Sequence, residues 1–189
     1  MELKRVVVTG LGAITPLGND VASTWEAAIA GKSGAGPITH FDASLFKTQF
    51  ACEVKNFNAA DHITDRKKLR QLDLYAQYAL VAARQAVEDS GLETSEGVDR
   101  NRVGVIVAAG IGGLHTFEEE AGYYAINHEK GPKYNPFFIP KMIADIASGH
   151  ISMEYGYHGP NYGVVSACAS SNNAIIDAFN YIRLGKADA

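Results

Sequence analysis

Cys168 stands where the sequence changes from a strand pattern to a helix pattern. The run before it, "YGVVSA", predicts a buried strand, and the apolar residues after it, among them Ile175, Ile176 and Phe179, predict an amphipathic helix. The small residues around the cysteine suit a sharp turn. A helix N-terminus favours the thiolate, and the backbone N–H of Cys168 could hold an acyl oxygen as half of an oxyanion hole. These residues alone leave two interpretations open, a nucleophile and a buried inert thiol.

Other motifs that could bind a cofactor or a metal are incomplete. In "GLGAITPLG", Thr15 stands where the dinucleotide-binding fingerprint needs its third glycine, and "AAGIGG" is not followed by the lysine and hydroxyl residue of a phosphate-binding loop. Both glycine clusters therefore predict close packing of the backbone. The six histidines and two cysteines show no metal-ligand spacing, and the sequence places no histidine near Cys168. We expect neither a cofactor nor a metal.

A basic run, "DRKKLR", carries four positive charges between Arg66 and Arg70. It is typical of a solvated helix face, and it also suits a docking patch for an acidic partner, because the chain is otherwise slightly acidic. The formal net charge of −4 gives no nucleic-acid-binding footprint.

The elements that must position these residues indicate an α/β fold. Continuous apolar runs at residues 5–12 and 101–113 and before Cys168 predict strands buried on both faces, with a long helix predicted over residues 64–92 and another over 116–127. No run of 18 apolar residues occurs, and two cysteines do not make a disulfide framework, so we expect a cytoplasmic protein with no membrane association. A further strand is expected after "RLGKADA", which suggests a chain cut short.

In order along the chain, several blocks resemble the β-ketoacyl-[acyl-carrier-protein] synthases, specifically the type II elongating enzymes of bacterial fatty-acid synthesis. The blocks are "RVVVTGLGAITPLGND", "DRKKLRQLDLYAQYAL", "RVGVIVAAGIGGL", "KGPKYNPFFIPKMI", "GPNYGVVSACASS" and "IRLGKADA". The resemblance implies a thiolase-like fold of mixed sheets layered α-β-α-β-α, of which residues 1–189 would form roughly the N-terminal half. It also implies a homodimer and a decarboxylative Claisen condensation between an acyl-enzyme thioester and malonyl-acyl-carrier-protein.

The same resemblance assigns roles to individual residues. Cys168 matches the nucleophile that accepts the acyl chain, Ile111 matches a residue that gates the acyl pocket, and Phe138 matches one that closes this pocket across the dimer interface. Basic positions that dock the acyl carrier protein match Lys67, Arg70 and, less closely, Lys133. Gln71 departs from this pattern, because some members carry another base at its position.

The two catalytic histidines of the family, its lysine and its second oxyanion donor belong to the C-terminal half, so we expect this chain to acylate Cys168 without condensing. A polyketide-type ketosynthase stays an alternative. A chain-length-factor subunit is disfavoured because such subunits lack the cysteine. A cysteine hydrolase would need a histidine base close to Cys168.

Overall fold

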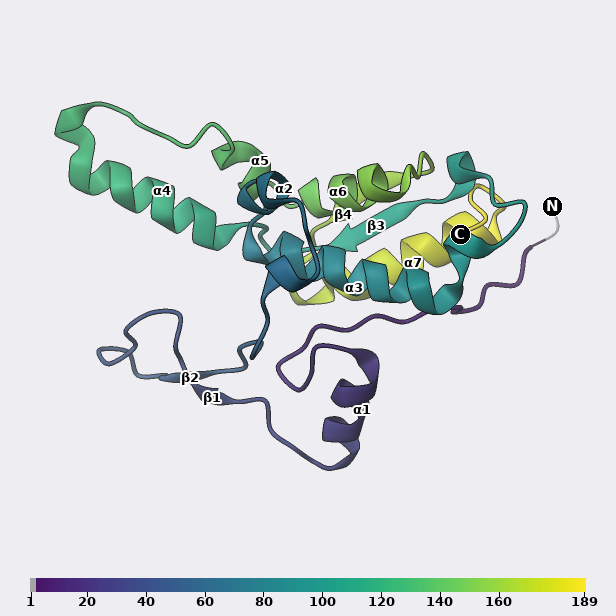
Figure 1. The fold of residues 1–189 in the computed structure, drawn as a ribbon, viewed down its shortest axis with the longest axis horizontal. Coiled ribbons are helices and arrows are strands. Elements are labelled where there is room, and N and C mark those ends of the chain that lie inside the picture. The colour runs from purple at the N-terminus through teal and green to yellow at the C-terminus, as the bar shows by residue number, and fades with distance from the viewer. Residues whose placement is uncertain (1–2) are drawn as a thin grey trace.

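The computed structural model describes residues 3–189, which form helices packed around a short parallel sheet (Figure 1). The helices are α1 (Val21–Ile29), α2 (Arg66–Arg70), α3 (Leu74–Ser90), α4 (Leu114–Asn127), α5 (Phe138–Met142), α6 (Ile146–Tyr155) and α7 (Ser170–Arg183). The strands are β1 (Gly36–Pro37), β2 (Phe50–Ala51), β3 (Val105–Ala108) and β4 (Asn161–Val164). The predicted α/β class is confirmed. None of the helices in the described part is long and apolar enough to cross a membrane.

The central sheet consists of β3 and β4, which pair in parallel with Val105 opposite Asn161 and Ala108 opposite Val164. Helix α6 lies on one side of this pair and α7 on the other (Figure 1). The buried core joins β3 to α3 and α6 through side chains that include Ala76, Leu80, Val105, Ala147 and Ile151. Three layers, helix on sheet on helix, therefore enclose β3 and β4.

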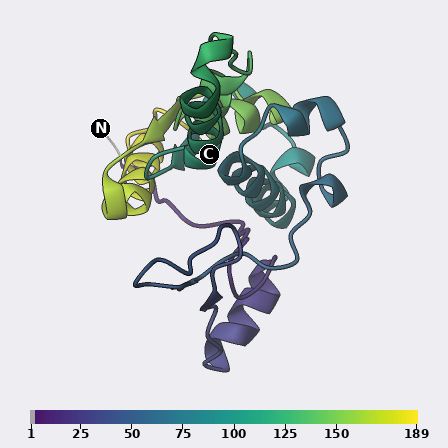
Figure 2. The ribbon, with the colours of Figure 1, turned by 90° about the vertical axis from the view of Figure 1, so that its left-hand side faces the viewer.

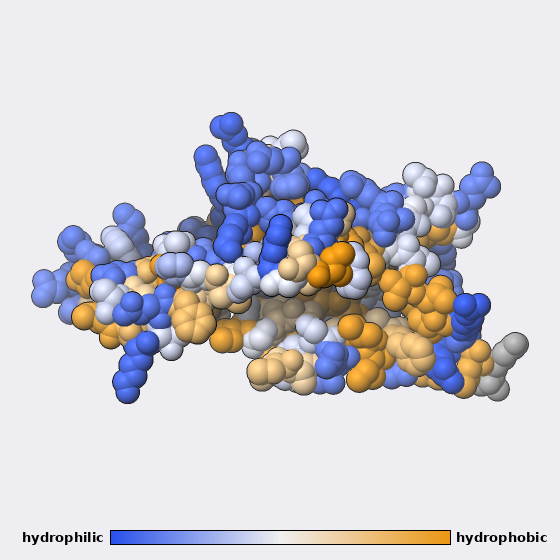
Figure 3. Space-filling model, turned by 90° about the horizontal axis from the view of Figure 1, so that it is seen from below, coloured by the Kyte–Doolittle hydropathy of each residue, from blue (hydrophilic) through white to orange (hydrophobic). Residues whose placement is uncertain are grey.

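Two parts of the chain project from these layers. Helix α4 and the segment that leads to α5 form an arm at one end of the molecule (Figure 1). Helix α1 and the antiparallel β1–β2 pair form a separate lobe, which is clearest after the 90° turn of Figure 2. Apolar side chains are exposed on this molecule, and Figure 3 shows many of them beside a hollow on the face seen from below.

The segment 5–12 is extended, but it forms no strand within the described residues, so that prediction is wrong. Its backbone bonds to side chains of α3: Leu11 N donates to Asp89 Oδ2 at 2.9 Å, and just beyond it Ala13 N donates to Gln85 Oε1 at 2.9 Å. Gly12 lies so close to α3 that a Cβ there would be 1.9 Å from the Ala82 carbonyl oxygen. The glycine turn therefore serves close packing, as the sequence suggested.

The long helix predicted over residues 64–92 is divided into α2 and α3, because Asp73 begins a new helix. Its Oδ1 accepts from Tyr75 N at 3.3 Å and caps α3. Its Oδ2 accepts from the backbone N–H and the hydroxyl of Thr116, at 3.0 and 2.6 Å. Because the N-cap of α4 is Gly113, which has no side chain to offer, the buried carboxylate of Asp73 caps both helices.

We predict that Asp73→Ala lowers the free energy of unfolding by about 2–4 kcal/mol, because it removes caps from two helices and leaves the buried donors of Thr116 unpaired. Asp20→Ala is the matched control, since Asp20 caps only α1 and is exposed. Its loss is expected to be clearly smaller. Urea unfolding followed by circular dichroism measures both, and equal losses would contradict the double cap.

An apolar groove of about 510 Å³ follows the edge of β3 that β4 leaves free. One wall is Ala79, Ala83 and Ala86 of α3, and the other is Ala174 and Ile175 of α7. The last residues of the chain already pair with this edge, because Gly104 N donates to the Ala189 carbonyl at 2.9 Å and Asp188 N donates to the Arg102 carbonyl at 2.8 Å. Alternation along a parallel strand directs the amides of Ile106 and Ala108 toward the same groove.

Five alternating valine and alanine residues appended after Ala189 should therefore continue this hydrogen-bond ladder along β3. We expect them to raise the free energy of unfolding by about 1–3 kcal/mol, because the apolar area that they bury contributes more than the conformational entropy that they lose. The control extension has the same composition except for proline as its second residue, which cannot donate to the Gly104 carbonyl. Thermal unfolding of monodisperse samples compares the two, and equal midpoints would show that the groove does not accept a strand.

Candidate active site around Cys168

The parallel pairing of β3 and β4 brings two predicted site residues to one edge of the sheet. Both strands end together, since Ala108 lies opposite Val164 and Ala109 N donates to the Val164 carbonyl at 3.2 Å. The loop after β3 carries Ile111, and the loop after β4 carries Cys168. The carboxyl edge of a parallel sheet is where ligands bind in open α/β folds.

Cys168 lies in a 3₁₀ turn, Ala167–Ala169, directly before α7. The thiol is exposed, which excludes the buried thiol that the sequence left open. Ala167 has a φ of 50°, a left-handed conformation that costs a residue with a Cβ about 1–2 kcal/mol. The predicted strand-to-helix turn is therefore present, and its backbone is strained next to the cysteine.

Two side chains of α7 hold this turn. The Ser170 hydroxyl accepts from Ser166 N at 2.8 Å and donates to the Ala167 carbonyl at 2.7 Å, so it closes the loop around the cysteine. The Asn173 amide donates to Ser166 Oγ at 2.7 Å. Ser170 is buried, whereas Cys168 is exposed. The arrangement presents a fixed, accessible thiol.

No histidine contacts this thiol through a hydrogen bond or an ion pair within residues 3–189. His150 is buried in α6, where burial and, to a lesser extent, the charge of Lys68 lower its pKa, so it is neutral at pH 7. His115 lies beside Glu119 on the exposed face of α4. Within the described residues, the candidate nucleophile Cys168 therefore has no histidine positioned to act as its base.

Ile111 is 67% exposed at the loop between β3 and α4. Neighbouring glycines let this loop pack against the segment before α6: a Cβ on Gly112 would lie 2.3 Å from the Met142 carbonyl oxygen, and Gly113 N donates to that oxygen at 2.9 Å. The Tyr75 hydroxyl donates to the Ile143 carbonyl at 2.5 Å, and burial raises the pKa of Tyr75 to about 12, so it stays a neutral donor. The base of the Ile111 loop is thus firmly held.

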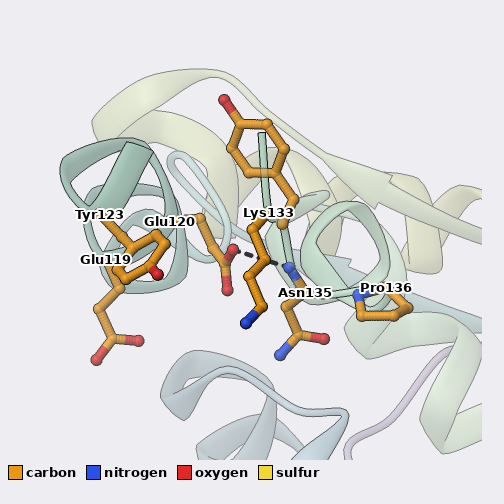
Figure 4. A pocket seen from close by; sticks show the side chains of 7 residues that line it. Glu119, Glu120, Tyr123, Lys133, Asn135 and Pro136 are labelled. Carbon is orange, nitrogen blue, oxygen red and sulfur yellow. Dashed lines mark hydrogen bonds between the residues drawn. The ribbon is translucent and has the colours of Figure 1, made fainter. Parts of the chain in front are cut away.

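Phe138 lies on the arm, where it stacks on Phe117 and Tyr134 with ring centroids 6.4 and 5.7 Å apart. Tyr124 continues this aromatic row through Tyr134. Lys133, on the same arm, lines a hollow of about 550 Å³ with Glu119, Glu120 and Tyr123 (Figure 4). In this hollow Glu120 accepts a hydrogen bond from Asn135 N at 2.9 Å. The surroundings of Lys133 are therefore acidic.

The remaining two predicted residues, Lys67 and Arg70, are exposed on α2. Sequence reasoning missed the residues that support the site: Asp73, Ser170, Asn173 and Glu154, the last of which forms an ion pair with Lys68 of α2. Asp73 had a detectable signal, because an aspartate before an apolar periodic run is typical of an N-cap. Ser170 and Asn173 had none, since serine and asparagine at a helix start are common.

Solved structures similar to this chain are ketosynthases of the thiolase fold. The ishigamide ketosynthase/chain length factor superposes with a TM-score of 0.86 at 29% identity, over 98% of this chain and 45% of that one. A second structure, of a type II PKS acyl-carrier protein in complex with its ketosynthase bound to the hexaketide, has a TM-score of 0.78 at 27% identity, over 98% and 49%.

Residues 3–189 match the family described as "Beta-ketoacyl synthase, N-terminal domain", and the chain belongs to this family. A curated relative, the 3-oxoacyl-[acyl-carrier-protein] synthase 2 of Staphylococcus aureus (strain COL), is 46% identical over 191 residues. That alignment covers 98% of this chain and 44% of the relative, so the chain spans less than half of the relative's length.

We predict that Ser170→Ala lowers the free energy of unfolding by about 1–3 kcal/mol, because the partly buried Ser166 N loses its acceptor. Ser171→Ala is the matched control: Ser171 is the next residue, is exposed, and should change stability by less than about 0.5 kcal/mol. Chemical denaturation measures both variants. If Ser170→Ala is as stable as Ser171→Ala, the serine does not hold the turn.

Proposed function

We propose that this chain is the acyl-accepting part of a 3-oxoacyl-[acyl-carrier-protein] synthase of fatty-acid elongation. The observation that carries the proposal is the exposed Cys168 on a strained turn at the carboxyl edge of the sheet, in a chain 46% identical to a synthase of that name. The family's decarboxylative condensation would then extend the acyl chain by two carbons.

The first half-reaction is a thioester exchange. The Cys168 thiolate attacks the carbonyl carbon of an acyl thioester, and the electron pair of the carbonyl moves to its oxygen. The N–H of Cys168 donates no hydrogen bond within residues 3–189, so it would be available to hold this oxyanion. When the carbonyl re-forms, the carrier's thiolate leaves and takes up a proton, so the acyl group has moved to Cys168.

The second half-reaction needs groups that residues 3–189 do not place near the thiol. Loss of CO₂ from a malonyl thioester leaves a carbanion, and the resemblance gives its stabilisation to a pair of histidines in the C-terminal half of the family. The S. aureus relative is more than twice the length of the aligned segment. We therefore interpret residues 1–189 as the N-terminal domain of a longer enzyme, which by itself accepts an acyl group without condensing it.

The proposed partners follow from the same site. Lys67 and Arg70, with Lys133 on the arm, would bind the acyl carrier protein, and a related ketosynthase is known in complex with such a carrier. Ile111 would gate the acyl pocket. The exposed aromatic arm suits a homodimer in which Phe138 closes the partner's pocket. The free thiols of Cys52 and Cys168 favour the reducing cytoplasm.

A polyketide-type ketosynthase is the second candidate, because both solved structures described above are of ketosynthases, one of them from a type II PKS. Their identities of 27% and 29% are well below the 46% of the fatty-acid synthase relative, which favours fatty-acid elongation.

Incubation with a hexanoyl-carrier thioester should add one hexanoyl group to the wild-type chain, as measured by intact-mass spectrometry. Cys168→Ala should remain unmodified because it lacks the nucleophile. Cys52→Ala is the matched control, since Cys52 is the other exposed thiol and should leave acylation unchanged. Acylation that persists in Cys168→Ala and disappears in Cys52→Ala would overturn the assignment, and rapid hydrolysis of the adduct would favour a hydrolase.

A further inference from the structure

The four cations of α2 do not share one environment. Arg66, Lys67 and Arg70 are exposed, whereas the side chain of Lys68 is only 22% exposed. Lys68 Nζ lies 2.5 Å from Glu154 Oε2 on α6. Two neighbouring lysines of one short helix are therefore directed differently, one outward and one toward the body of the molecule.

Glu154 is shared with a second cation. Its Oε1 lies 2.6 Å from Arg84 Nη2 of α3, and Arg84 also donates to the His62 carbonyl in the segment that precedes α2. Burial raises the pKa of Glu154, but the hydrogen bonds from Lys68 and Arg84 outweigh it and leave that pKa below its usual value. Glu154 is thus ionised at neutral pH and connects three parts of the chain.

Helix α2 needs this anchoring because a helix of five residues is not stable alone. Asp65 caps its first turn, accepting from Lys67 N at 2.8 Å and Lys68 N at 3.3 Å. Leu69 packs against the buried core. The pair Lys68–Glu154 adds a fixed point on α6 and so determines which side of α2 faces outward.

We propose that the charges of α2 are divided in function: Lys68 is a positioning residue held by Glu154, the carboxylate that Arg84 also binds, and Arg66, Lys67 and Arg70 form the surface that binds an acidic carrier protein. This inference rests on the proposed function for its partner. It adds Arg66 to the docking surface and excludes Lys68 from that surface. It also gives Glu154 the role of orienting helix α2.

The test compares Lys67→Met with Lys68→Met, which are neighbours on α2 and remove the same charge. Affinity of the chain for acyl carrier protein is measured by titration calorimetry at several salt concentrations, together with thermal unfolding. Lys67→Met should weaken binding about 3- to 10-fold and flatten its salt dependence, because a rim charge acts through screened attraction. Its unfolding midpoint should not change.

Lys68→Met should keep the salt dependence of the wild type and lower the unfolding midpoint by several degrees. Lys68→Arg should restore that midpoint, since it keeps a cation against Glu154, and Arg66→Met should behave like Lys67→Met. A salt dependence flattened equally by Lys67→Met and Lys68→Met would overturn the division, as would an unchanged midpoint in Lys68→Met.

The two proposals fail in distinguishable ways. If the wild-type chain binds no carrier protein, the docking surface is refuted, while acylation of Cys168 by a short pantetheine thioester still decides the acyl-accepting role. If carrier protein binds but both lysine variants lose affinity and salt dependence alike, the division of charges is wrong and the proposed function stands.

Discussion

The parallel pairing of β3 with β4 is the constraint on which the rest of the structure depends. Because the two strands end level with each other, the loops that follow them leave from the same edge, and Ile111 and Cys168 are carried there together. A shift of one residue would turn every inward side chain of a strand to its other face. Because α6 and α7 pack on the two faces of the sheet, such a shift would disrupt both contacts. The register of β3 against β4 therefore determines where the two loops of the site lie.

Small residues set how closely these layers approach. Ala76 and Ala147 are fully buried in the helices that cover the sheet, and a Cβ on Gly163 of β4 would lie 2.9 Å from the Asp145 Cα that precedes α6. Directly before β3, a Cβ on Gly104 would lie 3.0 Å from the carbonyl oxygen of Pro160, which precedes β4. Larger side chains at these places would force the adjoining backbone segments apart and move both loops, so packing far from the thiol sets its position.

The sequence predicted what depends on local pattern. The strands before Ile111 and Cys168 and the helices after them follow from apolar periodicity, and the turn at Cys168 follows from its small neighbours. The segment 5–12 has the same apolar pattern but pairs with no strand in residues 3–189, because strand pairing depends on a neighbour and not on the segment itself. The different environments of Lys67 and Lys68 could not be predicted either, since Lys68 pairs with Glu154, which is 86 residues away in sequence.

Different sets of side chains hold the proposed docking surface on α2 and the turn that carries the Cys168 thiol. Ser170 and Asn173 hold the turn at Cys168 from α7, whereas Glu154 and Arg84 hold α2 from α6 and α3. Asp73, which follows α2, begins α3 and caps α4, links the support of α2 to the helix after the Ile111 loop. A shared contact of this kind does not by itself show energetic coupling between α2 and the Ile111 loop. The two sets of hydrogen bonds share no residue within the part of the chain that the structure describes, so we expect the proposed carrier binding and the presentation of the thiol to respond to different substitutions.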